Sequence, residues 1–276
     1  MGDVPNAGQL ALLFAAIAAF AIGGVMSLAR FWQDSERLRL GPKICLYVGI
    51  LFGIGVIIWH DKLRTNWAPL DDNFDAMLWL ALLLAMFVAY TQRAHPLRGL
   101  DFFIMPIVVL LLVLAAVFGK AMPHTYVETP WSLAHRITAY GGFVAFAVAA
   151  AVGTMYLLTN YRLRHKRAAP AKGFGSLERL EHFAFTSVTL GFALLTIGMI
   201  TGLVWALRTH GDTSLGPHWY RNPKVLLASI TWIVYALVLH SPINPSFRGR
   251  RAALLSIVGF VVMIGTLFAA QFMPPK

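Results

Sequence analysis

The chain has 276 residues, of which 58% are hydrophobic and only 13% charged, and its mean hydropathy is +0.66. Because an ordinary soluble domain is about a quarter charged, a soluble core of this size could not bury so much apolar surface, and a soluble globular protein is excluded. The net charge of +11 would suggest a nucleic-acid partner in a soluble protein. In a membrane protein the same excess marks loops beside anionic lipid, so no nucleic acid is expected.

Eight segments are apolar enough to cross a membrane as helices. A hydrocarbon core of roughly 30 Å takes about 20 mostly apolar residues, and such runs lie near residues 8–29, 43–60, 74–91, 101–119, 132–158, 183–207, 223–240 and 252–272. The first run is expected to remain as a membrane helix, since the segment before it carries Asp3 and no Lys or Arg, unlike a signal peptide. The sequence therefore predicts an all-α polytopic bundle of about eight transmembrane helices, forming a single domain over residues 1–276.

The distribution of basic residues between the runs predicts the orientation. Short loops rich in Lys and Arg stay in the cytoplasm. Fifteen of the 23 Lys and Arg residues fall on one side, which includes a basic loop near residues 161–181. That side is expected to be cytoplasmic, and both termini are expected outside. The single cysteine, Cys45, lies in an apolar run and leaves no intrachain disulfide.

Histidines near the helix ends are the main candidates for chemistry, since a polar side chain in a membrane needs a partner or a wet cavity. His60, after Val-Ile-Ile-Trp, and His135, at the start of the fifth run, are expected at the outer face. His240 closes the seventh run, at the cytoplasmic face. A histidine there is often an interfacial cap, but imidazole is also the usual axial ligand of haem b. Both alternatives stay open.

The expected topology restricts the pairs of histidines that could share one haem. His60 and His240 are on opposite sides of the membrane and cannot ligate the same iron. An outer pair, His60 and His135, is compatible with the topology, as is an inner pair, His240 and His182. A protein that binds no haem is also compatible with this topology.

Two stretches carry a family likeness. Leu177 to His240 includes Gly-Phe-Ala-Leu-Leu-Thr-Ile-Gly-Met-Ile-Thr-Gly-Leu-Val-Trp-Ala, then Asn-Pro-Lys and Ile-Thr-Trp-Ile-Val-Tyr-Ala. The other stretch begins with an outer histidine and reads His135-Arg-Ile-Thr-Ala-Tyr-Gly-Gly-Phe-Val-Ala-Phe. These stretches resemble the core of the cytochrome c assembly protein family, the CcsA and HemX-like membrane proteins, and the resemblance covers most of the chain.

The resemblance implies haem handling at the outer face of the membrane. In that family an outer loop written W-G-x-x-W-x-W-D-P-K-E cradles haem between two outer histidines, and a further histidine pair holds haem within the bilayer. Three positions match this loop, namely Trp219, Pro223 and Lys224. Three depart from it, with Arg221 in place of a tryptophan, Asn222 in place of the aspartate and Val225 in place of the glutamate. The departures remove a broad apolar face and two acidic groups.

The function expected on this basis is a haem-binding or haem-handling membrane protein of cytochrome c biogenesis. The resemblance makes His135 and His240 candidate ligands of a haem b iron, and His60, Trp219 and Lys224 further candidate contacts of that haem. The expected partners are haem, apocytochrome c or other cytochrome c assembly proteins, and the lipid bilayer. The expected location is the bacterial inner (plasma) membrane, and the expected role is that of an assembly factor without catalytic turnover of its own.

Three other classes of membrane protein are alternatives to this function. A membrane subunit of a respiratory complex would use a b-type haem to pass electrons to or from quinone. A regulatory scaffold in tetrapyrrole metabolism would bind no haem. A transporter is disfavoured, because ionisable residues deep in the apolar runs are essentially absent.

The predicted orientation can be tested with reporter fusions. A reporter fused after Arg167 is expected to be active only if it is of the kind that works in the cytoplasm. One fused after Lys276 is expected to be active only if it is of the kind that works outside the cytoplasm. The reverse pattern would contradict the charge argument and every sidedness that follows from it.

Overall fold

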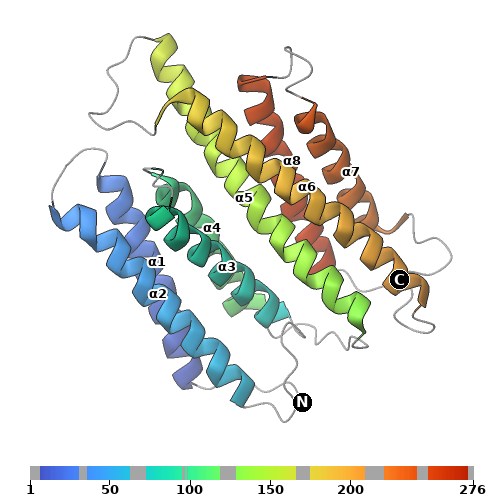
Figure 1. The fold of residues 1–276 in the computed structure, drawn as a ribbon. Helices are drawn as coiled ribbons and strands as arrows, with labels where there is room; N and C mark the ends of the chain where they lie inside the picture. The colour runs from blue at the N-terminus through green and yellow to red at the C-terminus, as the bar shows by residue number, and fades with distance from the viewer. Residues whose placement is uncertain are drawn as a thin grey trace. The chain divides into compact units, whose positions relative to one another are not determined.

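The computed structural model is a set of eight α-helices within the residues that it describes, which are 7–30, 36–62, 73–94, 97, 99–118, 129–165, 175–208, 221–240 and 248–272 (Figure 1). The helices are α1 (Ala7–Ala29), α2 (Glu36–Lys62), α3 (Asn73–Ala94), α4 (Leu100–Phe118), α5 (Pro130–Arg164), α6 (Leu177–Arg208), α7 (Pro223–Leu239) and α8 (Arg250–Phe272). Seven of them are long and apolar enough to cross a membrane, and α7 is a shorter apolar helix. The protein is therefore an integral, multi-pass membrane protein, as predicted.

The contacts divide the helices into two compact units, α1–α4 and α5–α8. In the first unit α1 packs on α2 and α4, while α3 packs on α4 and α2. Fully buried Phe20 of α1 lies against Gly49 of α2, where an added Cβ would lie 2.7 Å from the ring. Arg30 at the end of α1 pairs with buried Asp101 in the first turn of α4, at 3.7 Å. The single domain expected over residues 1–276 stays a prediction.

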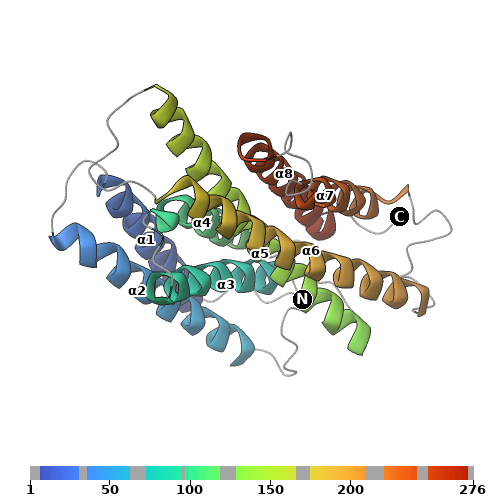
Figure 2. The same cartoon turned by 45° about the horizontal axis from the view of Figure 1, so that its top comes forward.

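In the second unit α5 and α6 run antiparallel and side by side, as both views show (Figures 1 and 2). Helix α8 packs on α5 and α7, and α7 also contacts α6. Gly153 lets α5 approach the backbone of α8 closely, since a Cβ at this position would lie 3.1 Å from the Ala253 carbonyl oxygen. Small residues at helix interfaces commonly permit such close packing in membranes.

Two aromatic residues of the motif Ile-Thr-Trp-Ile-Val-Tyr-Ala attach α7 to its neighbours. Tyr235 is fully buried, stacks on Phe146 of α5 with ring centroids 3.6 Å apart, and donates a hydrogen bond to the Ser256 carbonyl of α8 at 3.1 Å. The Nε1–H of Trp232 donates to the Thr196 hydroxyl of α6 at 3.0 Å. This part of the motif therefore serves the packing of the unit.

The predicted boundaries agree with the helices within a few residues, apart from three ends. Helix α2 begins at Glu36 and not at 43, and it contains Pro42. Helices α5 and α6 extend beyond the predicted 132–158 and 183–207, so that the basic loop predicted near 161–181 is confined between Arg164 and Leu177. The prediction followed apolar runs, whereas helical hydrogen bonding continues through charged residues with good helix propensity.

The contact between Tyr235 and α8 can be tested at Gly259, where an added Cβ would lie 2.9 Å from the tyrosine ring. Gly259→Ala is expected to push α7 and α8 apart and to lower the unfolding free energy by roughly 1–3 kcal/mol, the usual cost of overpacking. Gly265→Ala on the same helix is the matched control, because its Cβ would meet only Leu227 Cδ1 at 3.8 Å. Thermal unfolding in detergent, followed by circular dichroism, measures both. Equal stability of the two variants would contradict the packing described.

Candidate functional site

The position of His135 is set by the way α5 begins. Thr129 caps the helix, its hydroxyl accepting from the Ser132 N–H at 3.2 Å, and the Ser132 hydroxyl accepts from the Thr129 N–H at 3.1 Å. Pro130 occupies the first helical position, where its missing N–H costs nothing. This reciprocal capping box starts the helix at Pro130, ahead of the predicted start at 132. As a result His135 lies inside the helix and not at its first residue.

The side chain of His135 is half-buried against α6, and one hydrogen bond determines which ring nitrogen carries the proton. Its Nδ1 lies 2.7 Å from the carbonyl oxygen of Gly198. A carbonyl can only accept, so Nδ1 must carry the hydrogen in this contact. The Nε2 atom of the neutral imidazole then keeps its lone pair. Metal-binding histidines are commonly oriented in this way, with the second nitrogen donating to a backbone carbonyl.

Gly202 of α6 leaves the space that the imidazole occupies. An added Cβ at Gly202 would lie 2.7 Å from Nδ1 and 2.8 Å from Cε1 of His135. The Trp205 ring, one turn from Gly202, stacks with the imidazole at a centroid distance of 6.3 Å and an interplanar angle of 30°. A larger residue at Gly202 would fill the notch that holds His135. The ring is thus oriented by a fixed hydrogen bond and by a shaped surface.

The same end of the second unit carries cationic groups. The guanidinium of Arg208, at the end of α6, lies 5.2 Å from the centroid of the Trp131 ring at the start of α5. Helix α7 begins at this end with Pro223, and Asn222 caps it by accepting from the Lys224 N–H at 3.0 Å. Lys224 lies in the first turn, where its charge opposes the helix dipole. Helix stability therefore does not explain this lysine. Trp219 lies outside the described residues.

His240 is at the opposite end of this unit from His135, as predicted from the helix order. It is the exposed C-cap of α7, and its Nδ1 lies 2.8 Å from the Ala236 carbonyl oxygen of its own helix. His240 therefore caps the helix, and since Nδ1 donates to the carbonyl, the Nε2 atom of the neutral ring keeps its lone pair. His182 is exposed and lies near the start of α6. The inner pair of His240 and His182 stays a prediction.

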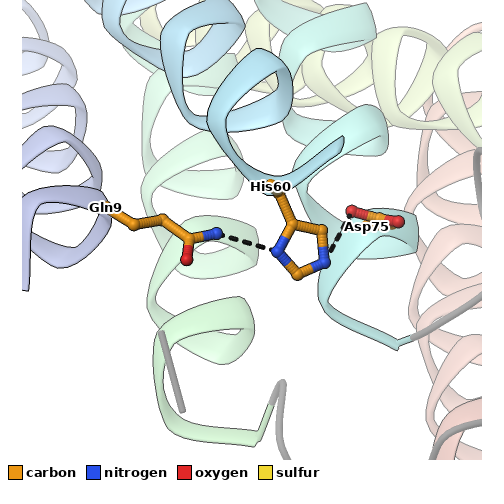
Figure 3. Close-up of polar contacts among 3 residues, drawn as sticks. All are labelled: Gln9, His60 and Asp75. Carbon is orange, nitrogen blue, oxygen red and sulfur yellow. Dashed lines mark hydrogen bonds and ion pairs between the residues drawn. The ribbon is translucent and has the colours of Figure 1, made fainter. Parts of the chain in front are cut away.

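His60 lies in the first unit, in a buried polar cluster with Gln9 of α1 and Asp75 of α3 (Figure 3). The Gln9 amide nitrogen is 2.9 Å from His60 Nδ1, and His60 Nε2 is 3.5 Å from Asp75 Oδ1. Gln9 and Asp75 are 1% and 2% exposed, so His60 takes the place of water as the partner of the Gln9 amide nitrogen and of Asp75 Oδ1. Both ring nitrogens of His60 are engaged. Iron binding by His60 would require one of these contacts to break, so the outer pair of His60 and His135 gains no support.

Sequence reasoning missed three parts of this arrangement. Gln9 and Asp75 carry no signal in the sequence, because each is a lone polar residue near a helix start, and such a residue is usually solvated. The glycine notch had a readable signal, since Gly198 and Gly202 stand four residues apart in an apolar run, the spacing of a close helix contact. Among the described residues no group of three or more His, Cys, Asp and Glu side chains could hold a metal ion.

Comparisons with known proteins agree with the motifs. A family model described as cytochrome C assembly protein matches residues 67–274. The chain is 24% identical over 267 residues to the cytochrome c biogenesis protein CcsA of Guillardia theta, covering 87% of this chain and 86% of that protein. It is also 24% identical to CcsA of Mesostigma viride, covering 85% and 84%. To CcsA of Hordeum vulgare it is 40% identical over 86 residues, which are 31% of this chain and 25% of that protein. No solved structure matches significantly.

The capping role of Asn222 leads to a prediction about the outer loop. Asn222→Ala is expected to lower the unfolding free energy by about 1 kcal/mol, because the Lys224 N–H loses its acceptor. Asn222→Asp should keep most of the stability, since a carboxylate caps equally well and carries the aspartate of the family motif. Thermal unfolding of the three proteins in the same detergent measures this. A loss with Asp as large as that with Ala would show that the amide has another role.

Proposed function

Because the chain belongs to the cytochrome c assembly protein family, whose model matches residues 67–274, we propose that it serves in cytochrome c biogenesis as a membrane protein that holds haem. The observation that carries the haem part of the proposal is the hydrogen bond from His135 Nδ1 to the Gly198 carbonyl at 2.7 Å. It orients the imidazole and leaves Nε2 as the ligand atom.

The residues around His135 fit a haem at the chemical level. Imidazole nitrogen is a common axial ligand of haem iron. Gly202 supplies a cradle that a Cβ would fill, which keeps the ring in place. Haem also carries two carboxylates, and Lys224 and Arg208 provide cations at the same end of the unit. When bound, haem supplies the iron porphyrin that is to be attached to an apocytochrome, and the residues named here bind and orient it.

Several finer features of the function belong to the proposal. The cofactor is haem b, because the site offers a histidine ligand and no thiolate for covalent attachment, the one cysteine being Cys45 of α2. The partners are apocytochrome c and other cytochrome c assembly proteins, and the protein acts as an assembly factor without turnover. The compartment is the bacterial inner membrane, with His135 toward the periplasm, in keeping with the basic charge near the opposite ends of the helices.

The role of His240 is separate from that of His135, since the two lie at opposite ends of the second unit. If two haems bind, His135→Ala should remove an outer one and His240→Ala an inner one, each leaving the spectrum of the other. If one haem binds, one substitution abolishes the signal and the other leaves it. If one haem binds and each of the two substitutions, made separately, abolishes it in protein that is normally inserted, this arrangement is wrong.

The haem proposal is tested by absorbance spectra of the purified protein, oxidised and then reduced with dithionite. His135→Ala is expected to lower haem retention about tenfold or more, and added imidazole should restore it by supplying the missing ligand. His165→Ala is the control, because His165 is an exposed histidine at the opposite end of α5, and its Nδ1 lies 2.9 Å from the Tyr161 carbonyl oxygen of its own helix. Failure of the wild-type protein to take up haem would favour a non-haem regulatory scaffold.

The orienting notch is tested by Gly202→Ala, whose Cβ would displace the His135 ring. This variant keeps every proposed ligand, so a fall in haem retention would show that the orientation of the ring matters. Haem retention is expected to fall roughly 10–100-fold, the usual effect of mutating a residue that orients a metal ligand. Unchanged retention in a folded Gly202→Ala protein would contradict the role given to α6.

A further inference from the structure

A cavity of about 1020 Å³ lies among the ends of α5, α6, α7 and α8 that are remote from His135. Its charged lining consists of four arginines and two glutamates, namely Arg164, Arg248, Arg250, Arg251, Glu178 and Glu181. These residues come from the end of α5, the start of α6 and the start of α8 with the turn before it. The cavity lies wholly within the second unit and shares no residue with the site around His135, but His182, the candidate partner of His240 for an inner haem, is among its lining residues.

The wall of this cavity is built by specific contacts. Gly249, in the turn before α8, has a positive φ of 62°, a conformation in which a side chain would be strained. Its N–H donates to Glu181 Oε1 at 3.3 Å, and an added Cβ would lie 2.6 Å from the Tyr156 hydroxyl. One of the two glutamates is therefore already engaged with the backbone. The arginines leave the lining with an excess of positive charge, which favours an anionic ligand.

Part of the lining is apolar. Phe185, Val238 and Ala253 also line the cavity, and Val238 and Ala253 are 3% and 6% exposed. Beyond the cavity, α7 and α8 present exposed apolar side chains, including Leu237 at 44% and Val258 at 51%. The arginine-lined cavity is thus at the end of membrane helices whose exposed side chains are apolar. A ligand matching both would be an anion attached to hydrocarbon chains.

We propose that this cavity binds an anionic phospholipid, with the phosphodiester held by the arginines and the acyl chains lying along the apolar surface of α7 and α8. Guanidinium groups bind phosphate through paired, charge-assisted hydrogen bonds. Tyr156 and Asn160, which also line the cavity, can hydrogen-bond glycerol or headgroup hydroxyls. Basic pockets between membrane helices on the cytoplasmic side are known to bind anionic headgroups, and this end is the one predicted to be cytoplasmic.

The apolar part of the arrangement favours a lipid over a soluble anion. Free phosphate would use the arginines alone and would gain nothing from Phe185 or from the apolar faces of α7 and α8. A volume of about 1020 Å³ is at the upper end of the range for pockets that take small molecules. It leaves room for a headgroup together with the first part of its chains. Because His182 lines the cavity, the experiment uses protein prepared without haem, so that haem does not compete with the lipid.

The test reconstitutes the full-length protein in nanodiscs of equal phosphatidylglycerol and phosphatidylcholine with the same acyl chains. Native mass spectrometry then measures which lipid stays bound after release. The wild-type protein is expected to retain phosphatidylglycerol in preference to phosphatidylcholine. The double variant Arg164→Gln, Arg250→Gln should reduce that retention about tenfold or more, equivalent to about 1.4 kcal/mol. Arg250→Lys, which keeps the charge, should retain more phosphatidylglycerol than Arg250→Gln.

Arg179→Gln is the matched control, because Arg179 lies between Glu178 and Leu180 at the same end of α6 but does not line the cavity. Retention by this variant should equal that of the wild type. An equal loss in Arg179→Gln and Arg250→Gln would mean general attraction to surface charge and would overturn the proposal. If the wild-type protein retains both lipids equally, the proposal is wrong whatever the variants show. If inorganic phosphate at millimolar concentration releases the lipid, the arginines bind a soluble anion and the lipid proposal is wrong.

Discussion

The close approach of α5 and α6 is the constraint on which the second unit depends. Gly202 has no side chain at the point where the imidazole of His135 crosses onto α6, and an added Cβ would lie within 2.8 Å of two ring atoms. Because the two helices come so close, a backbone carbonyl of α6 is within reach of a side chain of α5. The 2.7 Å contact between Nδ1 and the Gly198 oxygen follows from that proximity. Packing and chemistry are therefore specified by the same glycines.

Helix α7 is held in the second unit by two aromatic side chains. Tyr235 connects it to α5 and α8, and Trp232 connects it to α6, so the middle of the bundle is fixed by aromatic contacts and two hydrogen bonds. The two polar regions lie beyond this middle. One contains His135 and the start of α7, and the other contains the arginine-lined cavity. Since the middle is rigidly packed, each end can be substituted with little expected effect on the other.

Much of the fold could be predicted from the sequence, because apolar length alone identifies membrane helices. The ends of α2, α5 and α6 could not, since helical hydrogen bonds continue past the apolar run into charged residues. His135 was found by its place at a helix start and by family resemblance, but its proton position depends on Gly198, 63 residues away. His60 was predicted as a further candidate haem contact from its place at the outer end of its helix. The structure shows it occupied by Gln9 and Asp75, partners that no local pattern reveals.

The shortness of α7 has a consequence for the bilayer around it. At 17 residues and 1.5 Å per residue, the helix is about 25 Å long, several ångströms less than the usual hydrocarbon thickness. Such a mismatch is relieved by local thinning of the membrane or by drawing flanking polar groups inward, at a cost of fractions of a kcal/mol per ångström. Both ends of α7, Asn222 with Lys224 on one side and His240 on the other, would then lie nearer the bilayer midplane than the ends of the neighbouring helices. Water and headgroups would follow them inward beside α7.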